Sequence, residues 1–84
     1  MKKTVLVTGA SSGIGRATAI HLAQAGYNVY AAARRIDRTE SLREYGIHPV
    51  ELDITKEASL LNCINGIYKE AASIDVLINS GRLG

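Results

Sequence analysis

The chain has 84 residues, which is enough for one small domain and excludes a two-domain enzyme. Its hydrophobic fraction of 46% and charged fraction of 21% are typical of a folded globular protein, while a net charge of +2 and the absence of Phe and Trp argue against a nucleic-acid-binding protein. No apolar run is long enough for a membrane span or a signal peptide, so we expect a cytoplasmic protein, and the single Cys63 excludes an internal disulfide and gives no metal site.

Short apolar runs predict four strands along the chain. The first run is rich in β-branched residues and the second in alanine. The third follows Pro49, and the last is rich in Ile, Val and Leu. The predicted strands cover residues 4–8, 28–33, 50–52 and 74–79.

Helical patterns separate these runs. The first predicted helix covers 14–25 and ends before Gly26, and we expect its Ile14, Ala17, Leu22 and Ala25 to face the sheet. A short helix is predicted over 39–45 with Thr39 as its N-cap. Thr55 is the predicted cap of the third helix, whose apolar residues repeat at helical spacing up to Ala71.

Alternating strands and helices predict an α/β fold. The specific prediction is a doubly wound parallel sheet of the Rossmann type, incomplete, with four strands in the order 3-2-1-4 and three helices. In that order the first two helices cover one face and the third covers the other. Ligands in such sheets bind at the carboxyl ends of the strands, near the point where the strand order reverses. Here that point lies between the first and the fourth strand.

A glycine-rich turn follows the first strand. It reads Thr8-Gly9-Ala10-Ser11-Ser12-Gly13-Ile14-Gly15 and leads directly into the first helix. The first amides of a helix have no partner within the helix and attract anions, and glycines let a phosphate approach the backbone. The turn therefore predicts a diphosphate site, although the general dinucleotide fingerprint GxGxxG is not met.

The turn resembles the TGxxxGIG motif of the short-chain dehydrogenase/reductase family. Asp53-Ile54-Thr55 is similar to that family's Asp-x-Thr, and 75–79 is similar to the strand that leads into its Asn-Asn-Ala-Gly. The resemblance implies that 1–84 is the N-terminal half of an NAD(P)-binding Rossmann domain, with no second domain, and that Asp53 lies near adenine. The cofactor-binding candidates are Thr8, Gly9, Ser11, Ser12, Gly13, Ile14, Gly15, Arg34, Arg35, Asp53, Ile54 and Asn79.

The residues after the second strand indicate which cofactor is bound. Proteins that bind NAD place a carboxylate there, whereas NADP needs a cation for its 2′-phosphate. The chain has Arg34 and Arg35, so we expect NADP, with NAD as the alternative because Asp37 is close by. A solvated basic loop over 34–38 is the structural alternative.

The resemblance also shows what the chain lacks. Members of the family catalyse hydride transfer with a Ser and a Tyr-x-x-x-Lys beyond the fourth strand, and none of the four tyrosines here has Lys four residues later. After Asn79 the sequence departs from Asn-Asn-Ala-Gly, which suggests a truncated or frameshifted product with no catalytic residue.

An incomplete sheet would leave the fourth strand as an open edge, so we expect a homo-oligomer or a complementing fragment to pair with it. The leading interpretation is the cofactor-binding portion of an NADP-dependent short-chain oxidoreductase. The alternatives are a non-catalytic nucleotide-binding or interaction module and an inert remnant. The substrate cannot be deduced from these residues.

Overall fold

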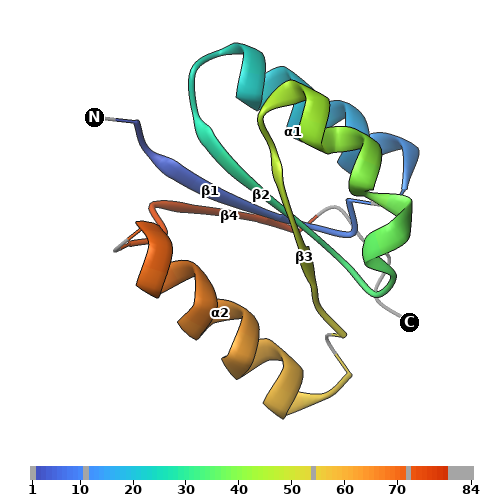
Figure 1. Cartoon of the computed structure of the whole chain (residues 1–84), viewed down its shortest axis with the longest axis vertical. Helices are drawn as coiled ribbons and strands as arrows, with labels where there is room; N and C mark the ends of the chain where they lie inside the picture. The colour runs from blue at the N-terminus through green and yellow to red at the C-terminus, as the bar shows by residue number, and fades with distance from the viewer. Residues whose placement is uncertain (1, 11, 54, 72, 80–84) are drawn as a thin grey trace.

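A computed structural model describes residues 2–10, 12–53, 55–71 and 73–79. Its centre is a four-stranded sheet in the order β3-β2-β1-β4, with all neighbouring strands parallel (Figure 1). The strands are β1 (Thr4–Thr8), β2 (Asn28–Ala33), β3 (His48–Glu51) and β4 (Val76–Asn79). The predicted strand order is therefore confirmed, with β3 starting two residues early and β4 two residues late.

Helical segments cover both faces of the sheet. They are α1 (Gly13–Gln24), the 3₁₀ turns η1 (Ile36–Arg38) and η2 (Glu40–Tyr45), and α2 (Glu57–Ala71). In Figure 1, α1 and the green segment after β2 lie on one side of the sheet and α2 lies on the other. This arrangement confirms the expected doubly wound fold. None of the helices in the described ranges is long and apolar enough to cross a membrane.

Two apolar clusters pack the sheet from its two sides. Alternate residues of β1 and β2 point to opposite faces, as the pleat of a strand requires. The first cluster lies under α1 and η2 and contains Val5, Val7, Val29, Ala31, Ala19 and Leu42. The second lies under α2 and contains Leu6, Tyr30, Ala32, Leu52, Cys63 and Ile67. The parallel strands are thus buried on both faces at the centre of the sheet.

The packing face of α1 agrees with the predicted one only at Leu22, which is partly buried and packs against the first cluster. Ile14 is 75% exposed, and Ala17 and Ala25 are also exposed, whereas Gly15 and Ala19 are buried against the sheet. Apolar residues occur all around this helix, so its sequence pattern does not specify a face. The small residues allow the helix to lie close to the strands, and that requirement decides the orientation.

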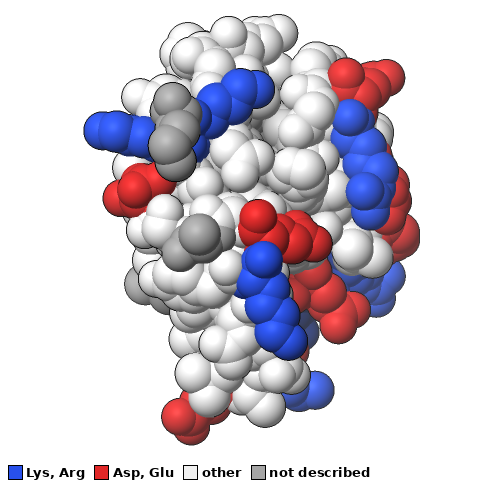
Figure 2. All heavy atoms as spheres, turned by 60° about the vertical axis from the view of Figure 1, so that its left-hand side comes forward, with Lys and Arg blue, Asp and Glu red and all other residues white. Residues whose placement is uncertain are grey.

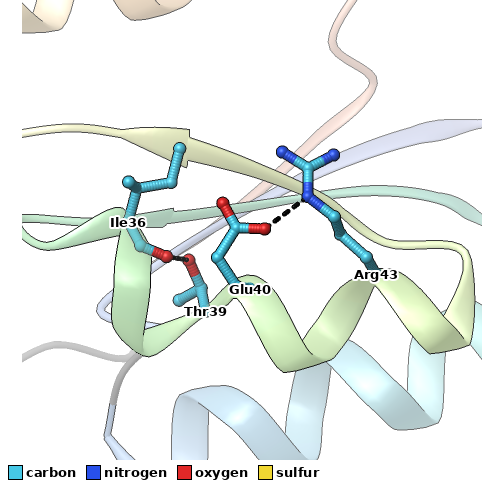
Figure 3. Close-up of polar contacts among 4 residues, drawn as sticks. All are labelled: Ile36, Thr39, Glu40 and Arg43. Atoms are coloured by element: carbon cyan, nitrogen blue, oxygen red, sulfur yellow. Dashed lines mark hydrogen bonds and ion pairs between the residues drawn. The ribbon is translucent and has the colours of Figure 1, made fainter.

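Both predicted threonine caps were also wrong. Thr39 is fully buried and makes no capping bond, because its hydroxyl donates backwards to the carbonyl of Ile36 over 2.9 Å (Figure 3). The segment that follows, Glu40–Tyr45, is a short 3₁₀ helix that ends at Tyr45 as predicted. Thr55 precedes α2 by two residues, and its hydroxyl donates to Asp53. In both cases an acceptor N-terminal to the threonine accepts the hydrogen bond of its hydroxyl.

Strand β4 is held to β1 at its start but is open on its other side. The amide of Thr4 donates to Asp75 Oδ2 over 2.8 Å, and the amide of Asp75 donates to the carbonyl of Thr4 over 2.9 Å. Beyond this contact Leu77 is 64% exposed and Val76 is 38% exposed. In the described part of the chain, β4 is therefore an edge strand with apolar side chains in contact with solvent.

Candidate functional site

The backbone conformation of Gly9 and two backbone hydrogen bonds hold the turn between β1 and α1. Gly9 has a φ of 68°, a conformation that residues with a Cβ rarely adopt. The next amide, that of Ala10, donates to the carbonyl of Ala32 over 3.1 Å and so ties the turn to β2. The amide of Ser12 donates to the carbonyl of Gly9, also over 3.1 Å. These bonds place the start of α1 directly beyond the carboxyl end of the central strand.

Ser12 is the N-cap of α1. Its hydroxyl oxygen accepts from the amide of Gly15 over 3.1 Å, and the same hydroxyl donates to the carbonyl of Gly9 over 2.8 Å. The Ser12 hydroxyl thus gives the amide of Gly15 an acceptor. The amides of Gly13 and Ile14, in contrast, have no acceptor among the described residues. The first turn of α1 carries no acidic residue. Two amides and the positive end of the helix dipole are thus available to an anion.

The described residues leave room at the Cα of Gly13. A Cβ built on Gly13 would meet nothing within 4 Å, and the Ile14 side chain extends into solvent. A phosphate group could therefore approach the backbone at Gly13 without displacing a side chain. The chemistry of the described residues is compatible with a diphosphate, and the predicted site stays a prediction. Ser11, which belongs to the same prediction, lies outside the described residues.

The predicted cations and Asp53 come after neighbouring strands. Arg34 and Arg35 are exposed and follow β2, and Asp53 is half-buried and follows β3. The amide of Leu52 donates to the carbonyl of Ala33 over 2.9 Å, which continues the β2–β3 pairing up to these residues. The structure therefore brings the three residues to the same end of the sheet, at the carboxyl ends of β2 and β3. Ile54 lies outside the described residues.

Asp53 is held by hydrogen bonds from its own turn. The hydroxyl and the amide of Thr55 both donate to Asp53 Oδ1, over 2.6 and 3.0 Å, and the amide of Asp53 donates to Ser59 Oγ over 2.9 Å. The two bonds from Thr55, with a smaller contribution from the positive charges of Arg34 and Lys56, lower the pKa of Asp53 below its usual value. The carboxylate is therefore ionised at neutral pH.

Thr8 and Asn79 are the last residues of β1 and β4, at the carboxyl end of the sheet. The Thr8 hydroxyl donates to Asn79 Oδ1 over 2.8 Å, at the point where β1 and β4 separate. Both side chains also line an apolar groove of about 330 Å³ between the sheet and α2. The rest of the groove is formed by Leu6, Leu52, Leu60, Ile64, Ile74 and Leu77.

Three features of this region, two hydrogen bonds and a groove, were not predicted from the sequence. They are the bond from Asp53 to Ser59, the apolar groove, and a bond of 2.8 Å from Arg16 Nη1 to Ser41 Oγ that joins α1 to η2. The position of Ser59, four residues after the predicted cap Thr55, is the signal that the sequence offers for the first of them. The Arg16–Ser41 bond and the groove both involve residues that are far apart in the chain.

Charges elsewhere on the surface are mixed or paired. On the face drawn in Figure 2, Lys and Arg side chains lie beside Asp and Glu side chains. In the segment after β2, Arg43 is paired with Glu40 over 2.6 Å (Figure 3), and both side chains are about half exposed. Arg34 and Arg35, in contrast, form no ion pair within the described ranges.

Comparison with known proteins identifies the family. The chain matches the short chain dehydrogenase family over residues 3–83. It belongs to this family. A relative from Myxococcus xanthus, described as an uncharacterized oxidoreductase, is 40% identical over 98% of this chain and 35% of its own length.

Other members of the family carry more specific descriptions. The NADP-dependent 3-hydroxy acid dehydrogenase of Schizosaccharomyces pombe is 40% identical over 96% of this chain and 34% of its own length. The solved alcohol dehydrogenase from Thermococcus sibiricus, in complex with 5-hydroxy-NADP, superposes with a TM-score of 0.82 and 32% identity over 92% of this chain and 36% of its own. The chain thus spans about a third of the short-chain dehydrogenases it matches.

Proposed function

We propose that residues 1–84 form the N-terminal, NADP(H)-binding part of a dinucleotide-binding domain in a short-chain oxidoreductase. The observation that carries this proposal is the start of α1, beside the carboxyl end of β1, where two amides have no acceptor among the described residues. That arrangement suits the diphosphate of a dinucleotide. Family membership supports a nicotinamide cofactor, which supplies a hydride acceptor or donor when it is bound.

The preference for NADP rests on the residues after β2. Arg34 and Arg35 are exposed there without an ion-pair partner in the described part of the chain, and Ala33 stands where an NAD-binding protein would place a carboxylate. A guanidinium can form two parallel bonds to a phosphate. The two relatives whose descriptions mention NADP support the same choice.

Competitive titration of the two cofactors tests this proposal. NADPH should bind more tightly than NADH to the 84-residue chain, as followed by nicotinamide fluorescence. Arg34→Asp should weaken NADPH by about 10- to 100-fold, because it removes a charge-assisted hydrogen bond and adds repulsion, and it should not weaken NADH. Arg43→Asp is the matched control, since Arg43 has the same charge but is paired with Glu40. An unchanged NADPH preference in Arg34→Asp would refute the assignment.

A second candidate function is an interaction module that uses the edge of β4. The specific observation is the exposed side chain of Leu77 beside the apolar groove under β4. A strand from a second copy or from a complementing fragment could pair with the open backbone groups and cover Leu77.

Light scattering over a range of concentrations tests this second candidate. The chain should become larger as its concentration rises, and Leu77→Lys should keep it monomeric. A monomer at all concentrations, with a sharp unfolding transition that does not depend on concentration, would argue against association through β4.

A further inference from the structure

A glycine lies inside α2 without a packing reason. Gly66 is exposed, and a Cβ built on it would meet no atom of the described residues within 4 Å. Alanine would therefore fit at this position, and alanine is the better helix former. Gly66 thus lowers the intrinsic stability of α2 and leaves open space beside the helix.

That space belongs to a pocket of about 270 Å³ between α2 and the β3 side of the sheet. The sheet contributes Tyr30 and Val50 to its wall, and the buried side of α2 contributes Ile67. Strand β3 is the edge strand farthest from β4, and none of the residues that line the pocket is a candidate for the dinucleotide site. The pocket is therefore a separate feature of the molecule.

The exposed wall of the pocket is one stripe of α2. Asn62, Gly66 and Glu70 follow one another at a spacing of four, which places them on the same face of the helix, and all three line the pocket. The first and the last are about 12 Å apart along the helix axis. Gly66 is the gap between these two polar side chains, so a linear molecule could lie along α2 across it.

The polar end of this stripe is held by a buried phenol. Glu70 Oε2 accepts from the Tyr30 hydroxyl over 3.0 Å, and the Tyr30 ring stacks on His48 with 4.7 Å between the ring centroids. Glu70 Oε1 has no hydrogen-bond partner in the described part of the chain, and the carboxylate forms no ion pair there. None of the described residues that line the pocket is Lys or Arg. One oxygen of an oriented carboxylate is thus available to a cationic donor.

We propose that this pocket binds a linear alkylammonium ion, whose ammonium group donates to Glu70 Oε1 and whose carbon chain crosses Gly66. A carboxylate and an ammonium form a charge-assisted hydrogen bond. The apolar side chains of Val50 and Ile67 would cover the methylene groups. The volume is at the lower end of those of small-molecule sites, which suits a ligand of this size. This binding does not depend on the proposed dinucleotide function.

Nitrogen-15 NMR of the 84-residue chain, titrated with n-pentylammonium, tests the proposal. The amide resonance of Gly66 should shift and reach saturation. The neutral n-pentanol has the same carbon chain and should bind about tenfold more weakly, the value of one hydrogen bond to a charged group. A shift that does not saturate, or equal affinities of the two compounds, would overturn the proposal.

Gly66→Ala should change stability and binding in opposite directions. The midpoint of urea unfolding should rise because alanine favours the helix, whereas n-pentylammonium should bind about tenfold more weakly because the methyl group narrows the pocket. Asn65→Ala is the matched control, since it also improves the helix but does not line the pocket. That variant should keep the full affinity. Unchanged affinity in Gly66→Ala would show that the glycine does not shape a binding site.

Glu70→Gln tests the charge at the end of the pocket. Glutamine keeps an acceptor for the Tyr30 hydroxyl but removes the charge, so n-pentylammonium should bind about tenfold more weakly and n-pentanol equally well. Glu44→Gln, at an exposed position outside the pocket, should bind both compounds like wild type. NADPH affinity should be the same in all these variants. A parallel loss of NADPH binding would indicate a general structural change and contradict a separate site.

Discussion

The Thr8 hydroxyl lies 2.8 Å from Asn79 Oδ1, and this hydrogen bond joins the carboxyl ends of β1 and β4. At the opposite end of β4, Asp75 bonds the backbone of Thr4. Side chains therefore fasten both ends of a short edge strand to the centre of the sheet. The bond at Asn79 is also at the switch point of the strand order, where doubly wound sheets bind their ligands.

Asn79→Ala should destabilise the chain through β4. The substitution removes the acceptor of a partly buried hydrogen bond, so the free energy of unfolding should fall by about 1 kcal/mol. Urea unfolding followed by circular dichroism measures this change. Asn65→Ala, at an exposed position of α2, is the control and should not destabilise the chain. Equal stability of the two variants would mean that the Thr8–Asn79 bond contributes nothing.

Substitutions at Ser12 should separate helix capping from anion binding. Ser12→Ala loses the cap of α1 and should lower the free energy of unfolding by about 1 kcal/mol. Ser12→Asp keeps a capping oxygen and should retain most of the stability, but its negative charge should weaken NADPH binding at the adjacent amides. Urea unfolding and fluorescence titration measure the two effects. Tight NADPH binding to Ser12→Asp would argue against a phosphate at this turn.

Asp53 should make the stability of the chain depend on acid pH. Its pKa is lower in the folded chain than in the unfolded chain, where it is about 3.9. Its stabilising contribution is therefore complete above that value and is lost as the pH falls through the lower folded pKa. In urea unfolding between pH 2 and about 5, the free energy of unfolding should fall less steeply with decreasing pH for Asp53→Asn than for wild type. Parallel curves would contradict the prediction.

Tyr30 should have the opposite effect at alkaline pH. Burial and the neighbouring Glu70, whose Oε2 accepts from the Tyr30 hydroxyl over 3.0 Å, raise the pKa of this phenol. The contribution of the neutral phenol is complete below the unfolded value of about 10 and is lost as the pH rises through the folded pKa. Tyr30→Phe should be less stable at pH 7 by about 1 kcal/mol and should lose less stability above pH 10. Tyr68→Phe, on the exposed face of α2, should behave like wild type.

Much of the sheet and of the glycine-rich turn before α1 could be predicted because their signals are local. The β-branched residues of β1 and Gly9, which has a positive φ, report the backbone conformation at their own positions. Their order along the chain then limits the topology, since crossovers between parallel strands are right-handed. The roles of Thr39 and Thr55 could not be predicted in this way, because each hydroxyl had both a capping site and a nearby acceptor within reach.

The sequence by itself determined the strands, their parallel order and the glycine turn at the start of α1, because these depend on periodicity and backbone conformation. Only the tertiary structure decided which face of α1 is buried, where Gly15 and Ala19 pack against the sheet and Ile14 does not. It also decided that the charge of Arg34 acts on Asp53 and that Asn79 Oδ1 accepts a hydrogen bond from the hydroxyl of Thr8. Such pairs join side chains from different strands, and their distance is set by strand register and packing.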